Sequence, residues 1–142
     1  MNAIEIQNLI YALNQVIHNF GAASIIGFAS YGLIRQKSQQ VMEHSRSLLF
    51  LLGIAWAIQG TSGAIFGATT LHFNGQLPDI HGVAVIALII KIICVIVGFI
   101  LSMFVLWLHK KTVRPIPRIT WLASLLLGAT ALSAAAFLRW FS

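Results

Sequence analysis

Charged side chains are scarce in this chain of 142 residues, because Asp, Glu, Lys and Arg together make up only 8% of it. A soluble domain typically carries about 25% charged residues. Hydrophobic residues account for 58% of the sequence, and the mean hydropathy is +0.88. So little polar surface cannot keep a globular protein in water. This excludes an ordinary soluble enzyme or binding domain and indicates an integral membrane protein.

Cysteine and acidic residues are nearly missing as well. The single cysteine, Cys94, excludes a disulfide within the chain. The three acidic residues, Glu5, Glu43 and Asp79, all lie at or beyond the ends of apolar segments. A cation buried within those segments therefore has no carboxylate of the chain at its own depth.

Four long apolar segments take the place of charge, at about 7–34, 47–71, 82–108 and 119–140. Each can span the roughly 30 Å of bilayer hydrocarbon as a helix that rises about 1.5 Å per residue. The first has no basic leading region and contains Asn14 and His18, so we do not expect a cleaved signal peptide. The sequence predicts an all-α integral membrane protein, an up-down-up-down four-helix bundle forming a single domain over residues 1–142.

The basic residues are unevenly distributed around these segments. The first and third connections hold seven of them, and Arg139 alone lies at the opposite end; the seven are Arg35, Lys37, Arg46, Lys110, Lys111, Arg114 and Arg118. By the positive-inside rule, both basic connections should be cytoplasmic and both termini should lie outside. The net charge of +6 then reflects membrane topology. We expect the lipid bilayer as partner, with no nucleic acid, and either a homo-oligomer or a larger membrane complex.

Lys91 stands inside the third apolar segment, in ALIIKIICVI. Ionisable groups at such depth normally face the bundle interior and pair with something. Counting about 1.5 Å per residue from the outer ends of the segments places His18 at a similar depth. Gln59 falls nearby, and Asn14 lies one turn from His18 on the same face. The sequence therefore predicts one polar layer built from several helices.

Two features indicate that this layer binds a molecule. No carboxylate can pair with Lys91, so a ligand would supply the anion or acceptor, such as a propionate, a quinone oxygen or a phosphate. Gly60 and Gly63, in QGTSGAIFG, either let helices approach closely or leave room for a flat macrocycle. In the fourth segment, Thr130 and Ser133 are candidates for the same layer.

Histidine is frequent for so apolar a chain, with five residues. His18 is either an interhelical hydrogen-bonding group, worth about 0.6–2 kcal/mol, or an axial ligand of haem iron through its neutral imidazole. The second axial ligand stays open between His72, His81, a neutral Lys91 and no protein group at all.

The remaining histidines lie near the ends of the segments. His72 and His81 flank the external connection with Asp79 between them, and they form either a shallow zinc or copper site or an ordinary interfacial group. His44 and His109 lie in the basic ends, where we expect them to be solvated or to contact lipid headgroups.

The layout resembles the CopD/HemJ-like group of small four-helix membrane proteins. The resemblance is carried by His18 with the small residues after it, in HNFGAASIIG, and by Lys91 in LIIKIICVIVG, together with the chain length. The resemblance implies a location in a bacterial inner membrane. It also implies either haem b binding, with a His and a Lys needed for oxidising protoporphyrinogen, or periplasmic copper handling. The chain departs from the group in having no Trp-Gly pair shortly after His18.

These observations predict a haem-b-associated membrane redox protein acting on a porphyrin, quinone or metal-linked substrate, in which case it is an oxidoreductase. His18 would contact the iron, and Lys91, the expected catalytic residue, would neutralise a propionate or position the substrate. The other expected cofactor-binding residues are Asn14, Gln59, Gly60 and Gly63. Two alternatives are a non-catalytic accessory subunit of a respiratory or transport complex, and metal handling with His72, Asp79 and His81 at the entry. The lack of broken helices weighs against transport.

Overall fold

The structure, a computed structural model, describes residues 2–35, 45–110 and 115–141. Within these residues the chain forms four helices, α1 (Ala3–Arg35), α2 (Ser45–Asn74), α3 (Val83–Leu108) and α4 (Arg118–Phe141). All four are long and apolar enough to cross a membrane. The predicted all-helical fold and the positions of its apolar segments are therefore confirmed, with bounds that differ by a few residues.

Local sequence explains where these helices begin and end. Asn2 and Glu5 form a reciprocal cap at the start of α1, since Glu5 N donates to Asn2 Oδ1 at 2.8 Å and Asn2 N donates to Glu5 Oε2 at 3.0 Å. The end of α2 is set by Gly75, whose φ of 71° is the left-handed conformation that glycine adopts without strain. The carboxylate of Glu5 is thus engaged within its own helix end.

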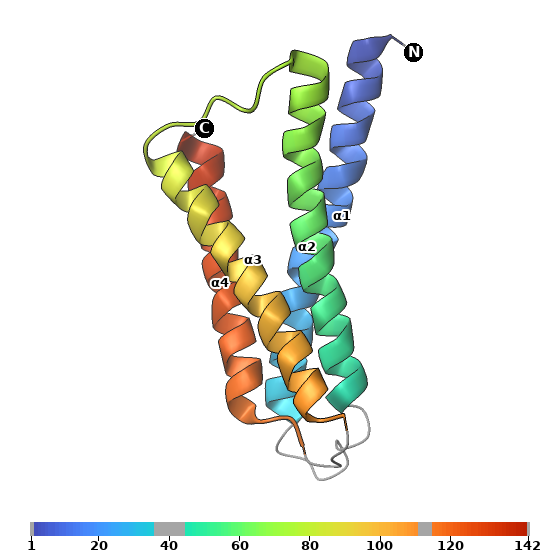
Figure 1. Cartoon of the computed structure of the whole chain (residues 1–142), viewed down its shortest axis with the longest axis vertical. Helices are drawn as coiled ribbons and strands as arrows, with labels where there is room; N and C mark the ends of the chain where they lie inside the picture. The colour runs from blue at the N-terminus through green and yellow to red at the C-terminus, as the bar shows by residue number, and fades with distance from the viewer. Residues whose placement is uncertain (1, 36–44, 111–114, 142) are drawn as a thin grey trace.

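The helices form two antiparallel pairs, α1 with α2 and α3 with α4 (Figure 1). Arg35, Arg46, Lys110 and Arg118 lie at one end of the molecule, which we call the basic end. Both termini lie at the other end, which we call the termini end (Figure 1). The two pairs pack together at the basic end and diverge toward the termini end, so the bundle is tight at one end only.

Two tryptophans join the pairs in the half of the bundle nearer the basic end. A Cβ on Gly98 of α3 would lie 2.6 Å from Trp56 Cζ2 of α2, and a Cβ on Gly32 of α1 would lie 2.8 Å from Trp121 Cε2 of α4. Both indoles are almost completely buried. Glycine is required at these two positions because any side chain would occupy the volume of an indole ring.

The stripe of α2 that carries Trp56 also carries Gly60, Gly63 and Gly67, and its contact with α3 ends after Gly60. A Cβ on Gly60 would still meet Val95 Cγ1 at 3.2 Å, whereas a Cβ on Gly63 or Gly67 would meet no atom within 4 Å. Toward the termini end, where the two helix pairs diverge (Figure 1), this stripe of α2 therefore faces open space at Gly63 and Gly67. We call this space the opening.

Gly98→Ala and Gly63→Ala should consequently differ in stability. An added methyl at Gly98 overpacks the buried Trp56 ring, which costs about 1–3 kcal/mol of unfolding free energy. The same methyl at Gly63 enters open space, so that variant should match or slightly exceed the unsubstituted protein. Thermal unfolding in detergent, followed by circular dichroism, measures both. Equal stability of the two variants would contradict the packing of α2 on α3 described above.

Candidate functional site

His18 of α1 lies at the centre of a polar cluster formed with α2 and α3. Its side chain is buried, with the residue only 7% exposed. Nδ1 lies 2.7 Å from Ser62 Oγ. Nε2 lies 2.8 Å from Gln59 Nε2 and 2.9 Å from Lys91 Nζ. The structure thus brings together His18, Gln59 and Lys91, as their depths predicted.

The neighbours of His18 determine where its ring proton lies. Both partners of Nε2 are nitrogens that carry N–H groups, an amide and an amine, and both are satisfied when Nε2 accepts with its lone pair. Ser62 Oγ donates to the backbone oxygen of Ile58, 2.6 Å away, and so it accepts from Nδ1. His18 is therefore a neutral imidazole with its proton on Nδ1. Its lone pair, on Nε2, is directed at Lys91 and Gln59.

Ser62 is the member of the polar cluster that sequence reasoning missed. Its hydroxyl bonds His18, and its backbone oxygen accepts a hydrogen bond from Asn14 Nδ2, 2.9 Å away. Asn14 is itself buried, and its predicted place one turn from His18 is confirmed. The available signal was spacing: Ser62 follows Gln59 by three residues and so lies on the same face of α2. Phe66, one turn further, makes a T-shaped contact with the His18 ring, with the ring centroids 5.5 Å apart.

Gln59 is only partly satisfied. Its Nε2 contacts His18, but its Oε1 is buried and has no hydrogen-bond partner among the described residues. A Cβ on Gly21 would lie 3.0 Å from this oxygen, so glycine there keeps α1 close to the amide. An unpaired buried carbonyl costs about 1–3 kcal/mol. The polar cluster therefore retains one acceptor without a protein partner.

Lys91 faces the interior and has a polar partner, but that partner is not an acid. Within the described residues the only ion pair joins His81 and Asp79, in the connection between α2 and α3. Glu5 caps α1, as noted above, and Glu43 lies outside the described residues. The described chain thus gives Lys91 a neutral hydrogen-bond acceptor and no counter-charge.

The expected contribution of α4 to this layer was wrong. Thr130 and Ser133 are both exposed, and Ser133 Oγ donates to Ala129 O of its own helix. The buried face of α4 instead passes through Gly128, Ala131 and Ala134. Depth alone suggested the two hydroxyls, whereas the helical phase turns them away from the core.

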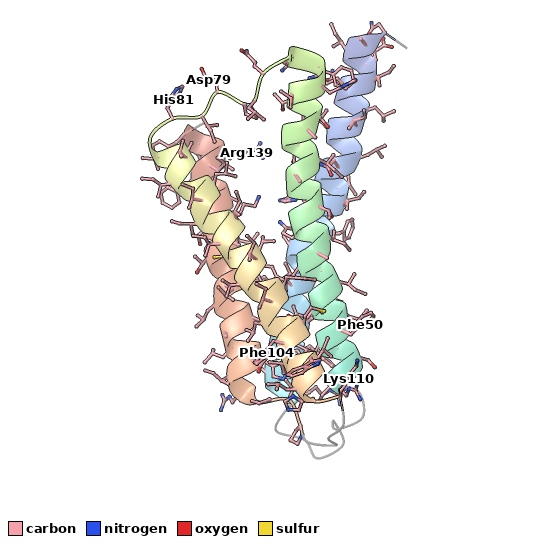
Figure 2. All side chains as sticks on the ribbon, in the orientation of Figure 1. Phe50, Asp79, His81, Phe104, Lys110 and Arg139 are labelled. Carbon is pink, nitrogen blue, oxygen red and sulfur yellow. The ribbon has the colours of Figure 1, made fainter. Side chains whose placement is uncertain are left out.

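Neither His72 nor His81 joins the cluster around His18. Within the described residues, the two histidines and Asp79 do not form a three-residue metal site. His81 Nε2 and Asp79 Oδ1 are 3.3 Å apart, and their side chains are 81% and 85% exposed. Both lie on the connection that precedes the first residue of α3 (Figure 2). His72 packs against Phe73. In the parts of the chain that the structure describes, no group of three or more His, Cys, Asp or Glu could hold a metal ion. The sequence predictions on Lys37, His44, Lys111 and Arg114 lie outside the described residues.

No protein-family model, no curated protein and no solved structure matches this chain. The fold and the site define its class: an all-helical protein with four helices long and apolar enough to cross a membrane, and a largely buried His–Lys–Gln–Ser cluster between three of them.

Proposed function

We propose that the protein is a haem-b-associated redox protein of a bacterial inner membrane, in which His18 ligates the iron through Nε2. The observation that carries this proposal is the hydrogen bonding of His18. Ser62 Oγ lies 2.7 Å from Nδ1 and accepts its proton in a hydrogen bond, which leaves the Nε2 lone pair as the ligating position. Metal-ligating histidines usually have their other ring nitrogen held in this way.

The surroundings of His18 fit such a group. Gly63 and Gly67 border open space, and Phe66 offers an aromatic surface beside the imidazole. The unpaired Gln59 Oε1 shows that the cluster is not fully satisfied by the described protein groups alone. Haem b bound here would supply one-electron redox chemistry, tuned by the axial ligand and its hydrogen bonds.

The contact between Lys91 and His18 assigns Lys91 a role in the same site. One lone pair on Nε2 cannot serve both an iron and the Lys91 amine 2.9 Å away. When His18 ligates iron, Lys91 loses this acceptor, and an amine at such depth requires another polar partner. An acid group on the bound molecule meets that need. Lys91 would therefore neutralise a propionate, or hold the acceptor oxygen of a porphyrin or quinone substrate.

The absorbance spectrum of the purified protein is the direct test. Protein made in haem-replete cells should show a Soret band and bind about one haem per chain, because the described cluster contains one imidazole that could ligate iron. A spectrum without Soret absorbance would refute the haem proposal. If such a bare protein also co-purified with subunits of a larger complex, the accessory-subunit alternative would replace it.

The orientation proposed is that the basic end faces the cytoplasm and the termini end faces the periplasm. The support is the predominance of Lys and Arg at the basic end, together with the location of both termini at one end of the bundle (Figure 1). A C-terminal alkaline phosphatase fusion should be active, and a C-terminal green fluorescent protein fusion should be dark. The reverse pattern would place His18 and Lys91 nearer the cytoplasmic side.

A further inference from the structure

Arg139 is a second cation on the side of the opening. It lies near the end of α4, is exposed, and stands between α4 and α2 (Figure 2). The packing of α4 shows which of its faces is directed toward α1, because a Cβ on Gly128 would lie 2.9 Å from Ile25 Cγ2 of α1. Arg139 follows Gly128 by eleven residues, which is within about 20° of three full turns. Arg139 therefore lies on the face of α4 that is directed toward α1 and α2.

Lys91 occupies the equivalent face of α3. Gly98 packs on Trp56 of α2, and Lys91 precedes Gly98 by seven residues, within about 20° of two full turns. Its hydrogen bond to His18 shows directly that it reaches α1. Two cations on neighbouring helices are thus directed toward the same helix pair, across the part of the bundle where the pairs diverge (Figure 1).

The two cations differ in height along the bundle. Arg139 lies about 16 Å beyond Gly128 toward the termini end, at about 1.5 Å per residue. His18 lies about 10 Å beyond Ile25 in the same direction. Because Gly128 packs against Ile25, Arg139 is about 6 Å, roughly one helical turn, nearer the termini end than His18 and its partner Lys91.

We propose that Arg139 and Lys91 together recognise the acid groups of an amphipathic ligand whose apolar body lies in the opening. For the haem of the proposed function, on which this inference rests, the propionate edge would face the termini end, with Arg139 binding one carboxylate. The planar guanidinium forms paired hydrogen bonds with a carboxylate. Neither acid described in the chain competes for the site, because Glu5 caps α1 and Asp79 pairs with His81.

Metal-free protoporphyrin IX and its dimethyl ester test this assignment without iron ligation. Each is titrated by fluorescence into the full-length protein in phosphatidylcholine nanodiscs. Arg139→Gln should weaken binding of the diacid about 10-fold, the loss expected for a charge-assisted contact at a partly solvated site. It should leave the ester unaffected. Arg118→Gln is the matched control, because Arg118 is an exposed arginine at the opposite end of the same helix. It should change neither affinity.

The outcomes separate this inference from the proposed function. Equal effects of Arg139→Gln on diacid and ester, or no effect on either, would overturn the role of Arg139 even if haem is bound. If Arg139→Gln no longer affects the diacid more than the ester once phosphatidylglycerol replaces phosphatidylcholine, Arg139 would be assigned to a lipid headgroup. That result would also overturn the inference. Binding of the diacid that depends on Arg139, in a protein that lacks a Soret band, would support the inference while refuting the haem proposal. Failure of both porphyrins to bind would overturn the inference, and the Soret band alone would then decide the haem proposal.

Discussion

His18→Ala should remove haem from the purified protein while leaving the helices folded. The substitution deletes the Nε2 lone pair, which is the ligating position in the proposed function. Mutation of a residue that hydrogen-bonds a metal ligand typically costs about 10- to 100-fold in metal affinity. Removal of the ligating side chain itself should therefore cost more than about 100-fold. Haem content per chain, measured as the pyridine haemochrome, gives the result, and circular dichroism reports the fold.

His109→Ala is the matched control for this loss. His109 lies at the basic end, where its Nδ1 contacts the backbone oxygen of Val105 in its own helix end, 2.9 Å away. Its removal should leave the haem content unchanged. Retention of a normal haem content by His18→Ala, or equal losses in both variants, would exclude His18 as the specific ligand.

Ser62→Ala should give an intermediate result, and this grading tests the hydrogen-bond argument. Without Ser62 Oγ the Nδ1 proton loses its acceptor, and the imidazole is free to rotate or to change tautomer. We expect about a 10- to 100-fold loss of haem affinity. Thr61→Ala is a suitable comparison, because the Thr61 hydroxyl is exposed and bonds only its own helix. Identical behaviour of the two variants would show that Ser62 does not orient His18.

Much of the fold and part of the site follow from the sequence because two quantities are independent of tertiary detail. The length of an apolar run identifies a spanning helix, and the fixed rise per residue converts position into depth. These placed His18, Lys91 and Gln59 in one layer before their contacts were known. Asn14 followed from the same periodicity, since residues four apart share a helix face.

The remaining features depend on which way each helix is rotated and on how closely the pairs approach. Depth without rotation suggested Thr130 and Ser133, which the structure places on the exposed side of α4. Ser62 gave little signal, because a serine within an apolar helix usually bonds its own backbone, as Ser62 also does. The helix pairs are joined by the packing of Trp56 on Gly98 and of Trp121 on Gly32, and the opening lies beyond these contacts. A periodic pattern does not specify such pairings.

Lys91→Met should leave the protein folded and at least as stable without ligand, yet weaken its hold on haem. Methionine preserves much of the side-chain length, suits an apolar environment and removes an amine that is costly to bury. His18 Nε2 still accepts from Gln59 Nε2, 2.8 Å away, so no ring nitrogen is left unsatisfied. Thermal unfolding of the ligand-free protein in detergent should therefore show an unchanged or higher midpoint.

The same substitution should lower haem affinity by about 10- to 100-fold, which corresponds to the roughly 1.5–3 kcal/mol of a hydrogen bond to a charged group. The loss is expected because the variant has no Lys91 amine to bind the carboxylate of the ligand. Haem dimethyl ester, which has no free carboxylate, should bind Lys91→Met at least as well as it binds the unsubstituted protein, since its binding no longer requires breaking the contact between Lys91 and His18. Lys91→Arg should restore haem affinity only in part, because the wider guanidinium holds its donors in a fixed fork. Wild-type haem affinity in Lys91→Met would show that Lys91 serves only to satisfy His18 in the ligand-free bundle, and an equal loss for haem and its ester would show a packing defect in place of a missing charge.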